Sequence, residues 1–102
     1  MDSTENLSCG QIVISKSGRD SGRLFVVTKI TGDGYVMLAD GDLRKIEKPK
    51  KKNSRHIAKH GALIVEIAEK IKRGERIENS DLRRVIEPLE IKGLIQADNQ
   101  EI

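Results

Sequence analysis

The first half of the chain shows the hydrophobic pattern of short β-strands. Apolar and β-branched residues gather in five segments: 11–16, 23–31, 35–39, 43–47 and 55–58. In the second segment Leu24, Val26 and Ile30 fall on one face and Phe25 and Val27 on the other, which is the period of two typical of a strand. Turns rich in glycine and aspartate separate the first four segments. Short strands joined in this way predict a small β-barrel, because closure of a sheet pairs its edges.

The segment Lys48–Ser54 interrupts this pattern. It contains four lysines and no large apolar residue, so we expect an exposed loop that begins where Pro49 ends the fourth strand. Neutralising Lys50, Lys51 and Lys52 together should then leave the fold intact, because changes at exposed positions cost little stability. A charge at Val26 should instead unfold the protein, because the alternation assigns this position to the core.

Beyond Gly61 the period becomes helical. Apolar residues three and four apart predict a helix over 62–73 that stops at Gly74. A second, short helix is indicated by Asn79 or Ser80 as N-cap and should end at Pro88. The mixed pattern of residues 89–102 predicts a tail.

Positive charge is concentrated in one segment. The formal net charge is only +3, but residues 44–60 hold eight basic residues and one acidic residue, and both flanking segments are net acidic. A local basic stripe is expected of a protein with a polyphosphate partner. The candidate contacts in this segment are Arg44, Lys45, Lys48, Lys50, Lys51, Lys52, Arg55, His56 and Lys59. Lysine predominates among them, which favours contacts to phosphate over recognition of bases.

A second set of candidate contacts surrounds the glycine-containing loop 17–22. Lys16, Arg19 and Arg23 frame this loop, and Gly18 and Gly22 allow backbone amides to approach a phosphate closely. Asp20, in the same loop, would repel phosphate. We therefore expect its carboxylate to accept hydrogen bonds from the loop's own amides.

Composition narrows the partner class and the compartment. The chain has no Trp, one Phe and one Tyr, so it lacks the rings on which single-strand-binding proteins stack bases. No apolar run reaches the roughly 20 residues of a membrane span. Cys9 is the single cysteine and cannot form an internal disulfide, which agrees with a reducing compartment. We expect a cytoplasmic protein that does not bind membranes.

No residue set indicates catalysis, a cofactor or a metal. The carboxylates are spread among turns and helix faces, and the glycine loop is not followed by the Lys-Ser or Lys-Thr of a Walker-type loop. His56 and His60 stand four apart, but together with Cys9 they fall short of the roughly four ligands that zinc prefers. The chain is therefore not expected to be an enzyme or to need a cofactor or metal.

The run from Gly10 to Arg23, followed by Val26 and Val27, resembles a KOW motif. The continuation 40–46, with the lysine run behind it, resembles bacterial KOW-domain RNA-binding proteins related to certain archaeal and eukaryotic large-subunit ribosomal proteins. Gly18 and Gly22 match glycines of that motif. The resemblance covers residues 9–60 and implies an SH3-like β-barrel that binds RNA, followed by a helical appendage over 61–88 and a tail over 89–102.

The resemblance and the charge pattern predict an RNA-binding, ribosome-associated protein. Its expected partner is structured RNA, either ribosomal RNA or the large ribosomal subunit, because folded RNA is recognised mainly through shape, phosphates and 2′-hydroxyls. One alternative is a protein-interaction adaptor, although peptide-binding barrels line their grooves with aromatic residues. A second alternative is an accessory factor of transcription elongation, because KOW domains also occur in such factors and contact proteins there.

Overall fold

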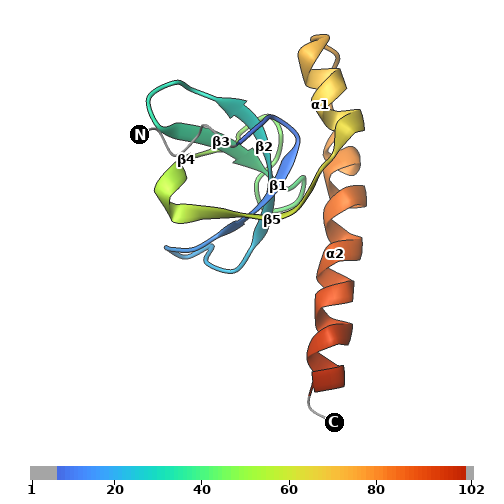
Figure 1. Ribbon diagram of the computed structural model, residues 1–102. Helices are drawn as coiled ribbons and strands as arrows, with labels where there is room; N and C mark the ends of the chain where they lie inside the picture. Colours follow the sequence, from blue (N-terminus) through green and yellow to red (C-terminus); the bar gives the residue numbers. More distant parts are fainter. Residues whose placement is uncertain (1–6, 101–102) are drawn as a thin grey trace.

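The computed structural model describes the backbone of residues 7–100 and the side chains of residues 7–90. Along the chain, five strands of one antiparallel sheet come first and two helices follow them (Figure 1). The strands are β1 (Gln11–Ser15), β2 (Leu24–Ile30), β3 (Tyr35–Ala39), β4 (Lys50–Asn53) and β5 (Ile57–Leu63). A 3-10 turn, η1 (Ser54–His56), joins β4 to β5, and the helices are α1 (Val65–Lys72) and α2 (Asn79–Gln100).

The five strands form one sheet in the order β4-β3-β2-β1-β5. The chain runs through β1 to β4 as neighbours and then returns, so that β5 pairs with β1. Among residues 7–100, no strand ladder joins β4 to β5, and the sheet is therefore not closed. The sheet and the helices that follow it confirm the prediction of a small β-sheet domain followed by helices.

Both faces of the sheet are buried. The face under the helices carries the helix-side cluster, which consists of Ile12, Leu24, Val26, Ala39, Ile67, Ile77, Leu82 and Ile86. The opposite face carries the far-side cluster, which consists of Val13, Phe25, Val27, Val36, Leu38 and Ile57. Successive residues of β1 and β2 therefore enter different cores, which explains why both strands read as apolar runs. No face of the central strands is left open for stacking bases.

A change of register in β2 corrects one detail of the predicted alternation. Val27 pairs with Leu38, but Lys29 pairs with Met37, so Thr28 is an extra residue in this strand. Ile30 consequently packs against the far-side cluster rather than beside Leu24 on the helix side.

Three of the five predicted strands are confirmed, and two differ. The residues of the predicted fourth strand, 43–47, form bends and turns, and β4 is instead formed by Lys50–Asn53, inside the segment predicted as a loop. The fifth strand covers Ile57–Leu63 rather than 55–58, because Ser54–His56 form the turn η1. Lys52 pairs with Val36 and Lys50 with Leu38, so these two lysines share the face of the far-side cluster. The loop prediction was wrong because these lysines find a carboxylate inside the protein, as described below.

The helices also differ from the prediction at their ends. Leu63 pairs with Gln11 at the end of β5, so α1 begins at Val65 and not near residue 62. Asn79, one of the two residues predicted as the N-cap, is already helical in α2, and the helix continues past Pro88 to Gln100. Pro88 is exposed, and the next residue, Leu89, packs against the helix-side cluster, which holds the helix to the sheet beyond the proline. None of the described helices has the length and apolar character needed to cross a lipid bilayer.

Candidate nucleic-acid interface

Two loops far apart in the sequence meet at one end of the sheet. The loop between β1 and β2 and the loop between β3 and β4 surround a hollow of about 240 Å³. Its lining is Arg19, Asp20, Arg23, Phe25, Leu43, Arg44 and Lys50. We call it the basic hollow after its four cations, Arg19, Arg23, Arg44 and Lys50, all of which were predicted as contacts. The fold brings the two predicted sets of contacts together here.

Asp40 positions two of these cations. Its Oδ2 pairs with the Nη2 of Arg23 at 3.1 Å, and its Oδ1 accepts hydrogen bonds from the backbone amides of Asp42 and Arg44 at 2.9 and 2.8 Å. Because an aspartate carboxylate readily binds amides two to four residues further on, this buried residue folds the turn that carries Arg44. One carboxylate thus fixes both sides of the hollow.

The helix α2 holds the same loop from the other side. Arg83 donates from Nη1 to the carbonyl oxygen of Gly41 at 2.7 Å. Asn79 accepts from the amide of Ile46 at 2.7 Å and donates to the carboxylate of Glu47 at 3.0 Å. The side chain of Asn79 therefore anchors the loop and is not the helix N-cap acceptor that the sequence predicted. The helical segment supports the basic hollow through these contacts.

Asp20 lies under the hollow in a polar cluster. Its Oδ1 accepts hydrogen bonds from the Nζ of Lys52 at 2.7 Å and the Oγ of Ser15 at 2.8 Å, and its Oδ2 pairs with the Nζ of Lys50 at 2.7 Å. Lys52 also donates to the carbonyl oxygen of Ser17 at 2.7 Å. The expectation that Asp20 binds the loop's own amides was wrong: its partners are two lysines of β4 and the hydroxyl of Ser15.

The charge of this cluster follows from its contacts. Burial alone raises the pKa of the Asp20 carboxyl, but the hydrogen bonds from Lys50, Lys52 and Ser15 outweigh burial and hold its pKa well below the ordinary value. The carboxylate is thus ionised between two ammonium groups. Since one negative charge faces two positive charges, the cluster leaves positive charge beneath the hollow.

The two glycines of the loop between β1 and β2 allow the backbone to turn there. Gly18 and Gly22 have φ values of 84° and 89°, in the left-handed region that favours glycine. The amide of Gly22 donates to the carbonyl oxygen of Ser15 at 2.8 Å, and that of Ser21 to Gly18 at 3.2 Å. The amides of Ser21 and Gly22 are thus already occupied within the turn, and the side chains that this loop offers to the hollow are those of Arg19 and Arg23.

The remaining predicted contacts fall into three places. Lys45 and Lys48 are exposed beside Arg44, where they line a neighbouring hollow of about 410 Å³. Lys51 points the other way from Lys50, forms an ion pair with Asp33 at 3.5 Å and lies 4.9 Å from the centre of the Tyr35 ring. Lys16, Arg55, His56 and Lys59 are exposed at and around η1. Lys52 is buried, with 7% of its side chain exposed, and is withdrawn from the surface.

The cations of the two halves differ in their partners. In the helical segment, Lys70 and Arg84 pair with Asp81, Arg73 with Glu75, and Arg76 with Glu78. In the sheet half, several exposed cations have no carboxylate partner among the described side chains: Lys16, Arg19, Arg44, Lys48, Arg55 and Lys59. Most of the unpaired positive charge on the described side chains therefore lies in the sheet half, although Lys72 of α1 is also exposed without a carboxylate partner.

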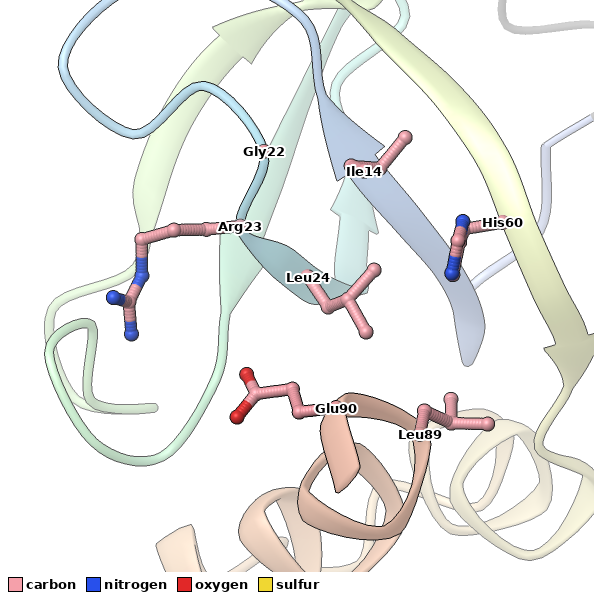
Figure 2. A pocket seen from close by; sticks show the side chains of 7 residues that line it. All are labelled: Ile14, Gly22, Arg23, Leu24, His60, Leu89 and Glu90. Atoms are coloured by element: carbon pink, nitrogen blue, oxygen red, sulfur yellow. The ribbon is translucent and has the colours of Figure 1, made fainter. Parts of the chain in front are cut away.

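Sequence reasoning missed two parts of this region. Leu43 was assigned to a strand, yet it is 67% exposed at the rim of the basic hollow. A groove between the sheet and α2 also went unpredicted, because Leu89 and Glu90 were assigned to a tail (Figure 2). The spacing of Leu82, Ile86 and Leu89, four and three residues apart, was a signal that the helix continues past Pro88.

In comparisons of the sequence with known proteins, neither a protein-family model nor a curated protein matches the chain.

Proposed function

We propose that this protein binds structured RNA through the basic hollow, and that it is a cytoplasmic, ribosome-associated protein of the KOW type. The observation that carries the proposal is the meeting of Arg19, Arg23, Arg44 and Lys50 from two loops around one cavity. The guanidinium groups of Arg19 and Arg44 have no anionic partner among the described side chains. Arginine forks of this kind bind phosphate through paired hydrogen bonds.

The covered sheet favours folded RNA over an extended single strand. Proteins that bind single strands stack successive bases on exposed aromatic rings. Here Phe25 is 1% exposed, and both faces of the central strands lie in hydrophobic clusters. Contact through loops that carry positive charge suits the phosphates and 2′-hydroxyls that a folded RNA presents.

The strand arrangement supports the SH3-like part of the proposal. A meander of four strands is followed by a short turn, and β5 returns to pair with β1. This arrangement places the last strand beside the first, as a small barrel requires. The glycine loop of the KOW resemblance lies between β1 and β2 and supplies Arg19 and Arg23 to the hollow.

A pair of matched double variants tests the hollow. Arg19→Gln with Arg44→Gln removes two charges from it, whereas Arg73→Gln with Arg76→Gln removes two charges from exposed positions in the helical segment. Binding to an RNA stem-loop is measured by fluorescence anisotropy over a salt series. For the parent, contact with about four to six phosphates predicts a loss of roughly two to three orders of magnitude in affinity between about 50 and 200 mM salt.

The two double variants should behave differently. The Arg19/Arg44 variant should bind more weakly and show a salt slope lower by about 2, while the Arg73/Arg76 variant keeps the parental slope. Equal effects of both would show that only net charge matters, and a flat salt response of the parent would reject RNA binding.

Cosedimentation with ribosomal subunits at low and high salt tests the proposed association with the ribosome. Migration with the large subunit at low salt, lost at high salt, is the expected result.

A further inference from the structure

A groove of about 460 Å³ lies between the sheet and α2. It is lined by Ile14, Gly22, Arg23, Leu24, His60, Leu89 and Glu90 (Figure 2). The side chains of Ile14, Leu24 and Leu89 give it an apolar interior, and three polar side chains border it. Its volume is in the range of about 300–1,000 Å³ common for small-ligand sites, which also combine apolar walls with a few polar groups.

Arg23 connects this groove with the basic hollow, because it lines both. An RNA strand whose phosphates occupy the hollow can therefore place the base of a neighbouring nucleotide in the groove. Arg23 pairs with Asp40 through Nη2, and its buried Nε has no acceptor among the described residues. A guanidinium has five N–H donors, and 37% of this side chain is exposed, so donors other than the one paired with Asp40 remain for a ligand in the groove.

Glu90 supplies the complementary charge. It is exposed and has no ion pair or hydrogen bond among the described residues. In Figure 2 its carboxylate points toward the side of the groove where Arg23 lies. One border of the groove therefore offers hydrogen-bond acceptors beside hydrogen-bond donors.

Among the four RNA bases, guanine fits this arrangement best. An ionised carboxylate only accepts hydrogen bonds, and guanine presents two adjacent donors, N1–H and N2–H. Adenine and cytosine each place a ring nitrogen acceptor beside their amino group, and a carboxylate repels that nitrogen. Uracil has a single donor on this edge, N3–H, between two carbonyl oxygens. Guanine also has the acceptors O6 and N7, which arginine binds in nucleic acids generally.

We propose that the groove binds an unpaired guanine of an RNA whose backbone occupies the basic hollow. Glu90 accepts from N1–H and N2–H, and Arg23 donates to O6. Leu24 and Leu89 contact the base, and the His60 ring provides a stacking surface. This inference rests on the proposed function and extends it by naming the base and the residues that select it.

The test uses the full chain and an RNA hairpin with a single bulged nucleotide, which is guanine, adenine or inosine. Affinities are measured at one salt concentration by fluorescence anisotropy. The guanine bulge should bind about tenfold more tightly than the adenine bulge, as expected for one good paired contact. Inosine lacks the N2 amino group and should fall between the two.

Two variants locate the selectivity. Glu90→Gln should bring the ratio of guanine to adenine affinity close to one, because the paired acceptors are lost. Glu87→Gln is the matched control: Glu87 is exposed one turn earlier in α2 and does not line the groove. Both variants remove a negative charge, but Glu90→Gln should weaken binding of the guanine hairpin, whereas Glu87→Gln keeps the guanine preference.

The outcomes separate this inference from RNA binding itself. Equal affinity for the three bulges, with a steep salt response, would overturn the guanine site and leave the proposed function standing. A guanine preference that survives Glu90→Gln would also overturn it. Absence of binding to every hairpin would overturn both.

Discussion

The Nζ of Lys52 lies 2.7 Å from the Oδ1 of Asp20, and both side chains are buried. This contact joins β4 to the loop between β1 and β2, and Ser15 completes it. The neighbouring Lys51 is exposed and points away. Three consecutive lysines that read as one charged run therefore have different roles.

Lys52→Met should destabilise the protein by about 1–3 kcal/mol, because it removes three hydrogen bonds from an ammonium and leaves Asp20 with fewer partners. Lys51→Met, at an exposed position, should change the free energy of unfolding by at most about 0.5 kcal/mol. Urea denaturation of both variants measures the difference. Neutralising all three lysines is therefore expected to weaken the fold, contrary to the expectation from sequence. Equal stability of the two variants would contradict the role given to Lys52.

The depressed pKa of Asp20 predicts acid sensitivity. A carboxyl whose pKa is lower in the folded state stabilises the fold above its unfolded pKa, and that contribution disappears as the pH falls toward the folded pKa. The stability difference between the parent and Asp20→Asn should thus be full at pH 7 and shrink as the pH falls below about 5. Asp42→Asn, at an exposed position, is the control. Denaturation at several pH values provides the measurement, and a pH-independent difference for Asp20→Asn would count against the ion pair.

Gly41→Ala should destabilise the protein by about 2–4 kcal/mol. A Cβ at this position would lie 2.2 Å from the carbonyl oxygen of Asn79, and the φ of 79° already disfavours a side chain. Gly32 has a similar φ of 81° but nothing within 4 Å, so Gly32→Ala should cost only about 1 kcal/mol. Thermal unfolding of both variants separates the clash from the backbone strain. Equal losses of stability in the two variants would contradict the close contact between Gly41 and Asn79.

Asn79→Ala should loosen the loop that carries Arg44. It removes the acceptor of the Ile46 amide and should cost about 1 kcal/mol. Hydrogen exchange at the Ile46 amide should accelerate, and RNA affinity should fall although Asn79 does not line the hollow. Ser80→Ala, at the exposed position next to it, is the control. Unchanged exchange at Ile46 would show that the helix does not hold the loop.

The parts of the fold that local pattern controls were predictable. The strands β1, β2 and β3 have β-branched residues between glycine turns, and these signals are contained in a few neighbouring residues. The strand β4 was not predictable in this way, because Lys50 and Lys52 pair with Asp20, thirty or more positions away. The extension of α2 beyond Pro88 likewise depends on Leu89 packing against the sheet.

The candidate site was likewise predictable in its residue types but not in how those residues are grouped. Residue type identified Arg19, Arg23, Arg44 and Lys50 as cations suited to phosphate, but no local pattern indicated which of them lie close together. Their grouping depends on Asp40, which binds both Arg23 and the turn before Arg44. The groove required the continuation of α2 that places Glu90 beside the sheet.

The position of β4 at the end of the sheet has a further consequence. Its outer edge has no strand partner among the described residues. An open edge is a template for pairing with another chain, and lysines along an edge discourage this. The charges of Lys50 and Lys52 are held by Asp20, so the exposed Lys51 is the lysine that would meet its own copy if two molecules paired through β4. Lys51 thus opposes assembly of the protein into edge-to-edge aggregates.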